Sequence, residues 1–121
     1  MRLTNTVDAA VDEYLHLIAR VCPWELPREE PRLRAFADWV ERQGDAVPDL
    51  ETIEPSMALR HARDDRLAAA ETEALMSAMA GLFRWAVRDG RVGYNPFSAA
   101  HEHARAAVRS FRGAQGETIS R

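Results

Sequence analysis

Residues 74–90 decide the fold, and they read ALMSAMAGLFRWAVRDG. Apolar side chains surround this segment on nearly every side up to Phe83, which is typical of a helix buried between other helices. Gly90 is placed to end the helix, because glycine is the residue most favoured just beyond a helix C-terminus. We therefore expect one long helix, over about residues 67–89, at the centre of this 121-residue chain.

Three shorter helices are expected before the central one. Residues 7–21 follow the capping residues Asn5 or Thr6, and residues 29–43 end at Gly44 as the C-cap. A third helix covers residues 55–64. The expected inward side chains are Val7, Val11, Tyr14, Leu15 and Ile18 in the first helix, Leu33, Phe36, Ala37 and Val40 in the second, and Ala58, Leu59 and Ala62 in the third.

The connections and the C-terminal part complete the prediction. Residues 22–27 contain two prolines and are expected to interrupt the helices, and residues 45–53 are expected to form a loop. A fifth helix is predicted over residues 98–112, capped by Ser98 and followed by a frayed tail. The predicted fold class is all-α, a compact bundle of four to five helices.

Composition narrows the class of protein. Apolar residues make up 46% and charged residues 29% of the chain, which is typical of an ordinary globular domain. No apolar run reaches the ~18 residues of a membrane span, and the single Cys22 excludes an intrachain disulfide and suits the cytoplasm. The net charge of −3 opposes a generic nucleic-acid binder, although the charge is unevenly distributed. Residues 1–54 hold 6 Arg against 12 acidic residues, whereas residues 55–121 hold 10 Arg against 7.

Two arginine stripes are candidate phosphate contacts, because guanidinium groups bind phosphate through paired hydrogen bonds. The first consists of Arg84 and Arg88 at helical spacing, with Arg91 just after them. The second consists of Arg105, Arg109 and Arg112, opposite an apolar face made by Ala104, Ala107, Val108 and Phe111. A solvated helix face is the alternative explanation of either stripe, and helix amphipathicity favours it. A third basic run, Arg60, Arg63 and Arg66, is diluted by Asp64 and Asp65.

Other chemistry finds little support. His101 and His103 are two residues apart and point about 200° apart on a helix, so they do not share a metal ion, while His16 and His61 stand alone. We expect no metal, no cofactor and no small-molecule substrate. Trp24, in the proline-rich stretch, is a candidate exposed anchor for a protein partner.

Several motifs together resemble a known family. They are Ser77-Ala78, the run FRWAVRDG at 83–90, and Asn95-Pro96, preceded by Leu33, Phe36 and Trp39, by Leu50, Ile53 and Pro55, and by Tyr14-Leu15. Over residues 8–97 the chain is similar to the core-binding, SAM-like N-terminal domain of tyrosine recombinases and phage integrases. The resemblance implies a four-helix domain over residues 1–97 whose second and fourth helices face the major groove of DNA, with residues 98–121 as an added helix and tail. The family's catalytic domain is absent and the chain has no lysine, so we expect no enzyme.

The chain also departs from this family. Glu29, Glu30, Glu71 and Glu73 lie where the family would face DNA, and carboxylates near phosphates weaken binding. Two hypotheses follow: a duplex-DNA-binding module, associated with the nucleoid, or a degenerate core-binding fold that serves in protein–protein contact or dimerisation. In the second, Trp24 and the apolar face of residues 104–111 would bind a recombinase partner or a second copy. Whether the chain is a whole protein or part of a recombinase, its target sequence and its oligomeric state stay open.

Overall fold

The structure, a computed structural model, describes residues 5–44 and 48–98. They form α1 (Val7–Val21), α2 (Leu26–Arg42), α3 (Pro55–Asp64) and α4 (Ala69–Arg88), with 3₁₀-helices η1 (Pro23–Glu25) and η2 (Leu50–Thr52). Apart from one isolated bridge between Thr6 and Asp49, these residues contain no β-structure. The predicted all-α class is confirmed.

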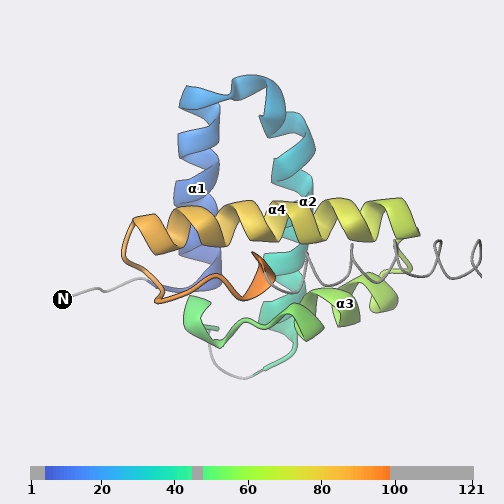
Figure 1. Ribbon diagram of the computed structural model, residues 1–121. Coiled ribbons are helices and arrows are strands. Elements are labelled where there is room, and N and C mark those ends of the chain that lie inside the picture. The colour runs from blue at the N-terminus through green and yellow to red at the C-terminus, as the bar shows by residue number, and fades with distance from the viewer. Residues whose placement is uncertain (1–4, 45–47, 99–121) are drawn as a thin grey trace, which may run out of the picture.

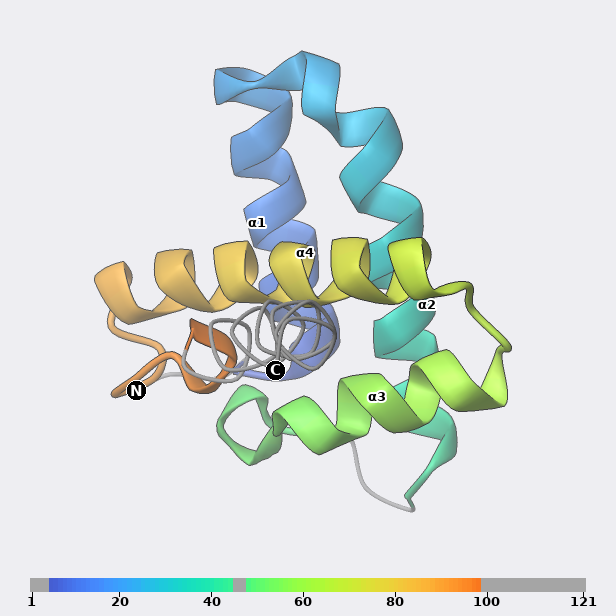
Figure 2. The ribbon, with the colours of Figure 1, turned by 45° about the vertical axis from the view of Figure 1, so that its right-hand side comes forward.

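The helices pack as two crossed pairs. α1 and α2 form an antiparallel hairpin joined by η1, and α4 runs across both of them (Figure 1). α3 lies below α4, beside the lower end of α2, and the view turned by 45° shows the same order (Figure 2). Because α4 has α1 and α2 on one side and α3 on another, it buries Leu75, Met76, Ala78, Met79, Ala80, Leu82, Phe83 and Ala86. This explains why its sequence is apolar nearly all round.

α1 forms as predicted. Thr6 is its N-cap, and the Thr6 hydroxyl accepts a hydrogen bond from the Ala9 N–H at 3.2 Å. The segment before α1 is held by the rest of the fold, because the Asn5 C=O accepts from the Leu50 N–H at 2.8 Å and the Asn5 amide donates to the Arg91 C=O at 3.0 Å. The start of the chain, the η2 loop and the turn after α4 are therefore linked.

α2 begins earlier than predicted. The prolines at 23 and 27 were expected to keep residues 22–27 out of a helix, but Pro27 lies in the first turn of α2, where its missing N–H has no partner to lose. Pro31 then lies within the helix and removes one hydrogen bond close to its start. The predicted C-cap was also wrong: Gln43 caps α2 with φ −86°, and Gly44 does not take a left-handed conformation.

α3 has the predicted bounds but one inward residue was wrong. Leu59 is 51% exposed, whereas His61 is buried together with Ala58 and Ala62. Positions 58, 61 and 62 are spaced by three and four residues and share one helical face, and position 59 lies outside it. The buried face of α3 therefore contains His61, and Leu59 lies on the exposed side.

Both α3 and α4 end in the same hydrogen-bonded turn. After α4, Gly90 has φ +75°, its N–H bonds to the Val87 C=O at 3.1 Å, and the Arg91 N–H bonds to the Ala86 C=O at 2.8 Å. This is a Schellman motif with glycine at the left-handed position, as the sequence predicted. After α3, Arg66 occupies the equivalent position with φ +55°.

A further helix begins at Pro96, and residues 96–98 are helical. Its cap is Asn95 and not Ser98: the Asn95 carbonyl oxygen accepts from the backbone N–H groups of Phe97 and Ser98 at 3.0 and 3.3 Å. The Asn95 amide also donates to the Ala80 C=O at 3.0 Å, which fixes the turn against α4. The rest of the predicted 98–112 helix, and the domain boundary at 97/98, lie at or beyond the end of the described residues and stay predictions.

Candidate nucleic-acid interface

Arg84 and Arg88 lie on the solvent side of the C-terminal half of α4. Both side chains are exposed, and their spacing of four residues places them on one helical face. The opposite face of this half of α4 is buried through Leu82, Phe83 and Ala86. Neither arginine forms a salt bridge with another described residue, so both guanidinium groups are accessible to an anion.

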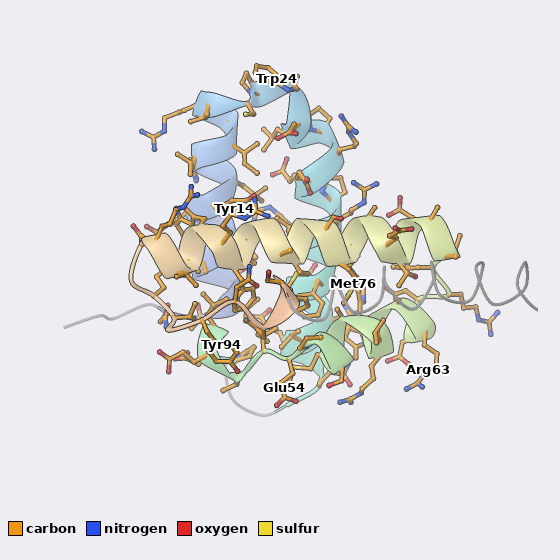
Figure 3. The ribbon with its side chains drawn as sticks, in the orientation of Figure 1. Tyr14, Trp24, Glu54, Arg63, Met76 and Tyr94 are labelled. Atoms are coloured by element: carbon orange, nitrogen blue, oxygen red, sulfur yellow. The ribbon has the colours of Figure 1, made fainter. Side chains whose placement is uncertain are left out.

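α1 contacts α4 beside this stripe, at Tyr14. The Tyr14 and Trp85 rings lie with their centroids 5.6 Å apart, and Tyr14 lies next to α4 in Figure 3. A Cβ atom at Gly81 would stand 2.9 Å from the Tyr14 hydroxyl oxygen, so glycine is what permits this close approach. Burial raises the pKa of Tyr14, as does the charge of Glu29, while the positive charge of Arg84 lowers it.

Glu29 is the acidic residue of α2 that lies nearest this contact. Its side chain is half-buried, and its Oε2 atom is buried with no hydrogen-bond partner among the described residues. Burial raises the pKa of Glu29, Glu25 raises it further, and Arg32 and Arg28 lower it. A carboxylate at this point repels phosphate, and this repulsion weakens as the group takes up a proton.

Two arginines of α2 are neutralised within the fold. Arg32 makes a bidentate pair with Glu71 of α4, with Nε–Oε2 and Nη2–Oε1 distances of 2.9 Å. Arg34 pairs with Asp12 of α1 at 3.1 Å and with Glu30 at 3.3 Å. Of the four glutamates that the sequence sets against DNA binding, Glu30 and Glu71 are therefore engaged by arginines.

Arg91 has a different place from the one predicted. It was grouped with Arg84 and Arg88 as a phosphate contact, but it is only 8% exposed. Its guanidinium pairs with Glu13 of α1 and with Asp89, and lies 4.8 Å from the centroid of the Trp85 ring. Arg91 therefore joins α1 to the end of α4 and does not offer its charge to a ligand.

The other predicted contacts are not placed together with Arg84 and Arg88. Trp24 is 69% exposed and lies at η1, at the far end of the α1–α2 hairpin from α3 (Figure 3). The second arginine stripe, Arg105, Arg109 and Arg112, and its apolar face, Ala104, Ala107, Val108 and Phe111, lie outside the described residues.

The arginines of α3 form no salt bridge with Asp64 or Asp65 among the described residues. Both aspartates are exposed beside the arginines, as the expected dilution of charge requires, and each also contacts a buried ring. The Trp39 indole N–H donates to Asp64 at 2.9 Å, and Asp65 Oδ2 lies 3.4 Å from His61 Nδ1. No local signal reveals the first contact, because Trp39 and Asp64 are 25 residues apart, whereas His61 and Asp65 are at i and i+4.

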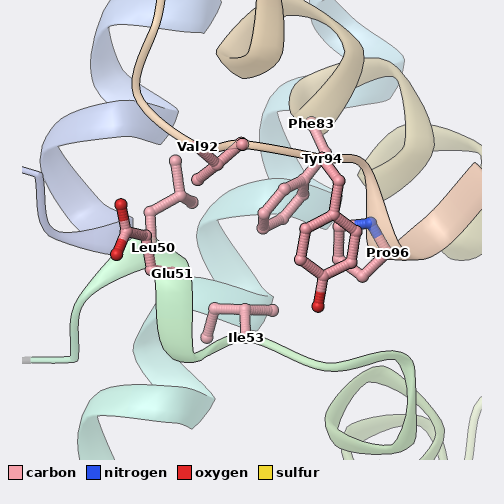
Figure 4. Close-up of a pocket in the computed structure, with 8 residues that line it drawn as sticks. Leu50, Glu51, Ile53, Phe83, Val92, Tyr94 and Pro96 are labelled. Carbon is pink, nitrogen blue, oxygen red and sulfur yellow. The ribbon is translucent and has the colours of Figure 1, made fainter.

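A cavity of about 320 Å³ opens below α4, between the η2 loop and the turn after α4 (Figure 4). Leu50, Ile53, Phe83, Val92 and Pro96 line it, with Tyr94 and Glu51 at its walls. These residues include one carboxylate and no histidine or cysteine, so they do not assemble a nucleophile with a base. Within residues 5–44 and 48–98, no group of three or more metal-ligating side chains is present, and no helix is long and apolar enough to cross a membrane.

Comparisons with known proteins identify the fold. No family model matches the chain, and no curated protein matches it. Among solved structures, a lambda integrase dimer bound to a COC′ core site matches with a TM-score of 0.61 and 21% identity, over 78% of this chain and 27% of the integrase chain. A lambda integrase tetramer bound to a Holliday junction matches with a TM-score of 0.62 and 21% identity, over 79% and 28%.

The chain therefore spans little more than a quarter of the length of these integrase chains. The resemblance that the sequence motifs predict is confirmed at the level of the fold: this is an all-α domain with the fold of a part of lambda integrase.

Proposed function

We propose that this chain is a non-catalytic DNA-binding module that contacts the backbone of duplex DNA through the C-terminal half of α4. The observation that carries the proposal is the pair of exposed arginines, Arg84 and Arg88, which no carboxylate of the described residues neutralises. Arg32, Arg34 and Arg91 are engaged in ion pairs and contribute less. Arg105, Arg109 and Arg112 are proposed as additional contacts.

The fold supports this proposal. The lambda integrase chains that share it were solved on DNA. The match covers about a quarter of those chains, so the proposal concerns DNA contact by this domain alone. Arginine contacts to phosphate give affinity without base recognition, so we expect binding to depend weakly on sequence and strongly on salt. Such a role associates the chain with the nucleoid.

The test is fluorescence anisotropy of a labelled 20-base-pair duplex with the full chain at ~50 mM salt. Nonspecific binding typically has Kd values of ~10⁻⁴–10⁻⁶ M at physiological salt and tightens at lower salt. The slope of log K against log [salt] should fall by about 0.9 for each arginine that loses its phosphate contact. We expect R84Q/R88Q to lower this slope by about 1.8.

R20Q is the matched control for the single variant R88Q. Arg20 is exposed near the end of α1, and each of the two substitutions removes one positive charge. R20Q should leave the slope unchanged. If wild-type protein at tens of micromolar produces no anisotropy change, the proposal is wrong. An equal loss in R20Q and R88Q would also contradict it, because the effect would then come from net charge alone.

Self-association forms the second part of the proposal. The two integrase structures contain a dimer and a tetramer, and we propose that this chain also contacts a second copy or a recombinase partner. Trp24, exposed at η1, and the apolar face of residues 104–111 are the proposed contact residues. Light scattering at high protein concentration tests this, and W24A should lower the apparent mass. A strictly monomeric wild type would contradict it.

A further inference from the structure

Four exposed arginines gather at the edge of the molecule formed by α3 and the end of α2. Arg42 lies in the last turn of α2, Arg60 and Arg63 lie on α3, and Arg66 follows α3 directly. Figure 3 shows Arg63 on the outer side of α3, near its C-terminal end. We call this set the α3 basic edge.

Asp64 and Asp65 lie at this edge, are exposed, and each contacts a buried ring. Asp64 accepts the hydrogen bond of the Trp39 indole, and Asp65 faces His61. Trp39 and His61 are both buried. None of the four arginines forms a salt bridge with another described residue. Asp64 and Asp65 are exposed among them, so the four arginines and two aspartates give the edge a formal charge of +2.

One of the arginines contacts the core, and a second lies close to it. The guanidinium carbon of Arg60 lies 5.5 Å from the centroid of the Trp39 ring, a cation–π contact with a buried residue. The positive charge of Arg42 lowers the pKa of His61, which places Arg42 on the same side of the molecule as the α3 residues. Besides Leu59, the exposed side chains of α3 are Ser56, Arg60, Arg63 and Asp64, so the surface presents charge more than an apolar anchor.

Arg66 provides an independent observation. It has φ +55° in the turn that ends α3, whereas the same turn after α4 uses Gly90. A side chain in this conformation is strained relative to glycine. The dipole of α3 attracts a cation at this end, but Arg63 already provides one in the last turn. Strained non-glycine residues of this kind concentrate at functional sites.

The α3 basic edge is separate from the stripe on α4. The C-terminal ends of α3 and α4 lie at opposite ends of the molecule in both ribbon views (Figures 1 and 2). Arg84 and Arg88 belong to the end of α4, and Arg63 and Arg66 to the end of α3. A single small anion therefore cannot contact the arginines of both helix ends at once. An extended polyanion can contact the arginines of either end.

We infer that the α3 basic edge is a second phosphate-binding surface, which takes the phosphodiester backbone of a nucleic acid independently of Arg84 and Arg88. The inference rests on the proposed function, because it assigns a second contact to a DNA-binding module. Guanidinium groups spaced along a helix edge suit a repeating phosphate chain better than a single small anion, which needs converging donors. The same domain can then contact two points of one duplex or two duplexes.

The experiment compares two double variants of the full chain by anisotropy with the labelled duplex over a series of salt concentrations. R63Q/R66G removes two charges from the α3 basic edge, and the glycine adopts the left-handed turn without strain. We expect this variant to lower the slope of log K against log [salt] by about 1.8 and R84Q/R88Q to lower it by a similar amount. The single variant R66G, whose thermal midpoint should not fall, confirms that the fold is intact, and R20Q controls for net charge.

The outcomes separate this inference from the proposed function. If R84Q/R88Q weakens binding and R63Q/R66G behaves as wild type, the α4 site stands and the second surface is wrong. If R63Q/R66G weakens binding and R84Q/R88Q does not, the second surface stands and the α4 site is wrong. No binding by wild type overturns both. Unchanged duplex binding by R63Q/R66G, together with loss of binding to labelled polyglutamate, assigns the edge to an acidic protein and also overturns the inference.

Discussion

The contact between Tyr14 and Gly81 shows how one residue sets the distance between two helices. Glycine inside a helix costs about 1 kcal/mol relative to alanine, so its presence in α4 needs a reason. The reason is steric, because an alanine Cβ would stand 2.9 Å from the Tyr14 hydroxyl oxygen but 4.0 Å from the ring carbon that carries it. Removing the hydroxyl should therefore remove the need for glycine.

We predict that G81A stabilises the protein by about 1 kcal/mol in a Y14F background, through helix propensity. In the wild-type background the displaced Tyr14 ring should cancel this gain. Urea unfolding of the four proteins, followed by circular dichroism, gives the double-mutant cycle. Equal effects of G81A in both backgrounds would show that Tyr14 does not restrict this position.

His61 is a buried histidine packed against two aromatic rings, with ring centroids 5.8 Å from Phe36 and 5.7 Å from Trp39. Burial lowers the pKa of His61 below the ordinary value of 6.5, and Arg42 lowers it further, although Asp65 and Asp64 raise it. Below pH 6.5 the His61 side chain therefore binds a proton more readily in the unfolded chain than in the folded one. The contribution of this group to the free energy of unfolding is present above pH 6.5 and falls as the pH drops below it.

For wild type we expect the free energy of unfolding to fall between pH 7 and pH 5, by at most about 1.4 kcal/mol per pH unit from this group. H61L should flatten this dependence, because leucine does not titrate. Urea unfolding at a series of pH values tests the slope. An NMR titration of the His61 ring that gives a pKa above 6.5 would contradict the sign.

At the scale of the element, α3 and α4 end in the same hydrogen-bonded turn but have different residues at its left-handed position. Arg66 after α3 and Gly90 after α4 both have positive φ, at +55° and +75°. Left-handed conformation costs a residue with a side chain about 1–2 kcal/mol. We predict that R66G raises the free energy of unfolding by about 1 kcal/mol and that G90A lowers it by a similar amount. Thermal denaturation measures both, and a destabilised R66G would show that the arginine contributes more through the helix dipole than it loses in strain.

The pairing of α2 with α4 through Arg32 and Glu71 bears on DNA binding. Arg32 donates to both carboxylate oxygens, and this hydrogen-bonded pairing lowers the pKa of Glu71. E71Q should leave the fold intact, because Glu71 is exposed, and should tighten duplex binding, because Arg32 becomes available and a negative charge is lost. E51Q is the matched control, because Glu51 is an exposed acidic residue of η2. An equal gain in duplex affinity in E71Q and E51Q would show that the effect comes from net charge alone.

The whole molecule carries a net charge of −3 with an isoelectric point near 5.8, so its average field repels DNA at pH 7. Binding then depends on local arginine surfaces that overcome this field. We predict that duplex affinity rises as the pH falls from 7.5 to 6, where the net charge approaches zero. E29Q should bind more tightly at pH 7.5, because it removes a carboxylate whose buried Oε2 atom has no hydrogen-bond partner among the described residues. Anisotropy at constant ionic strength measures this, and a pH-independent affinity would contradict it.

Much of the fold follows from local sequence. The bounds of α1 and α3 agree with those predicted, and α4 agrees within two residues at its start and one at its end. The errors have two causes. Pro27 and Pro31 are tolerated because they lie near the start of α2. Asn95, in contrast, caps the last helix where a tertiary contact also holds it, because its amide donates to the Ala80 C=O of α4.

The candidate site divides in the same way. By itself, the sequence determined the four helices, their order and the arginine stripe at Arg84 and Arg88, because spacing and caps act within one helical turn. Only the tertiary structure decided which arginines remain free of ion pairs with the described carboxylates and can contact a phosphate. Arg91 meets Glu13 from 78 residues away, and Arg32 meets Glu71 from 39 residues away. Such pairs depend on how the helices cross, since charge is neutralised by neighbours in space.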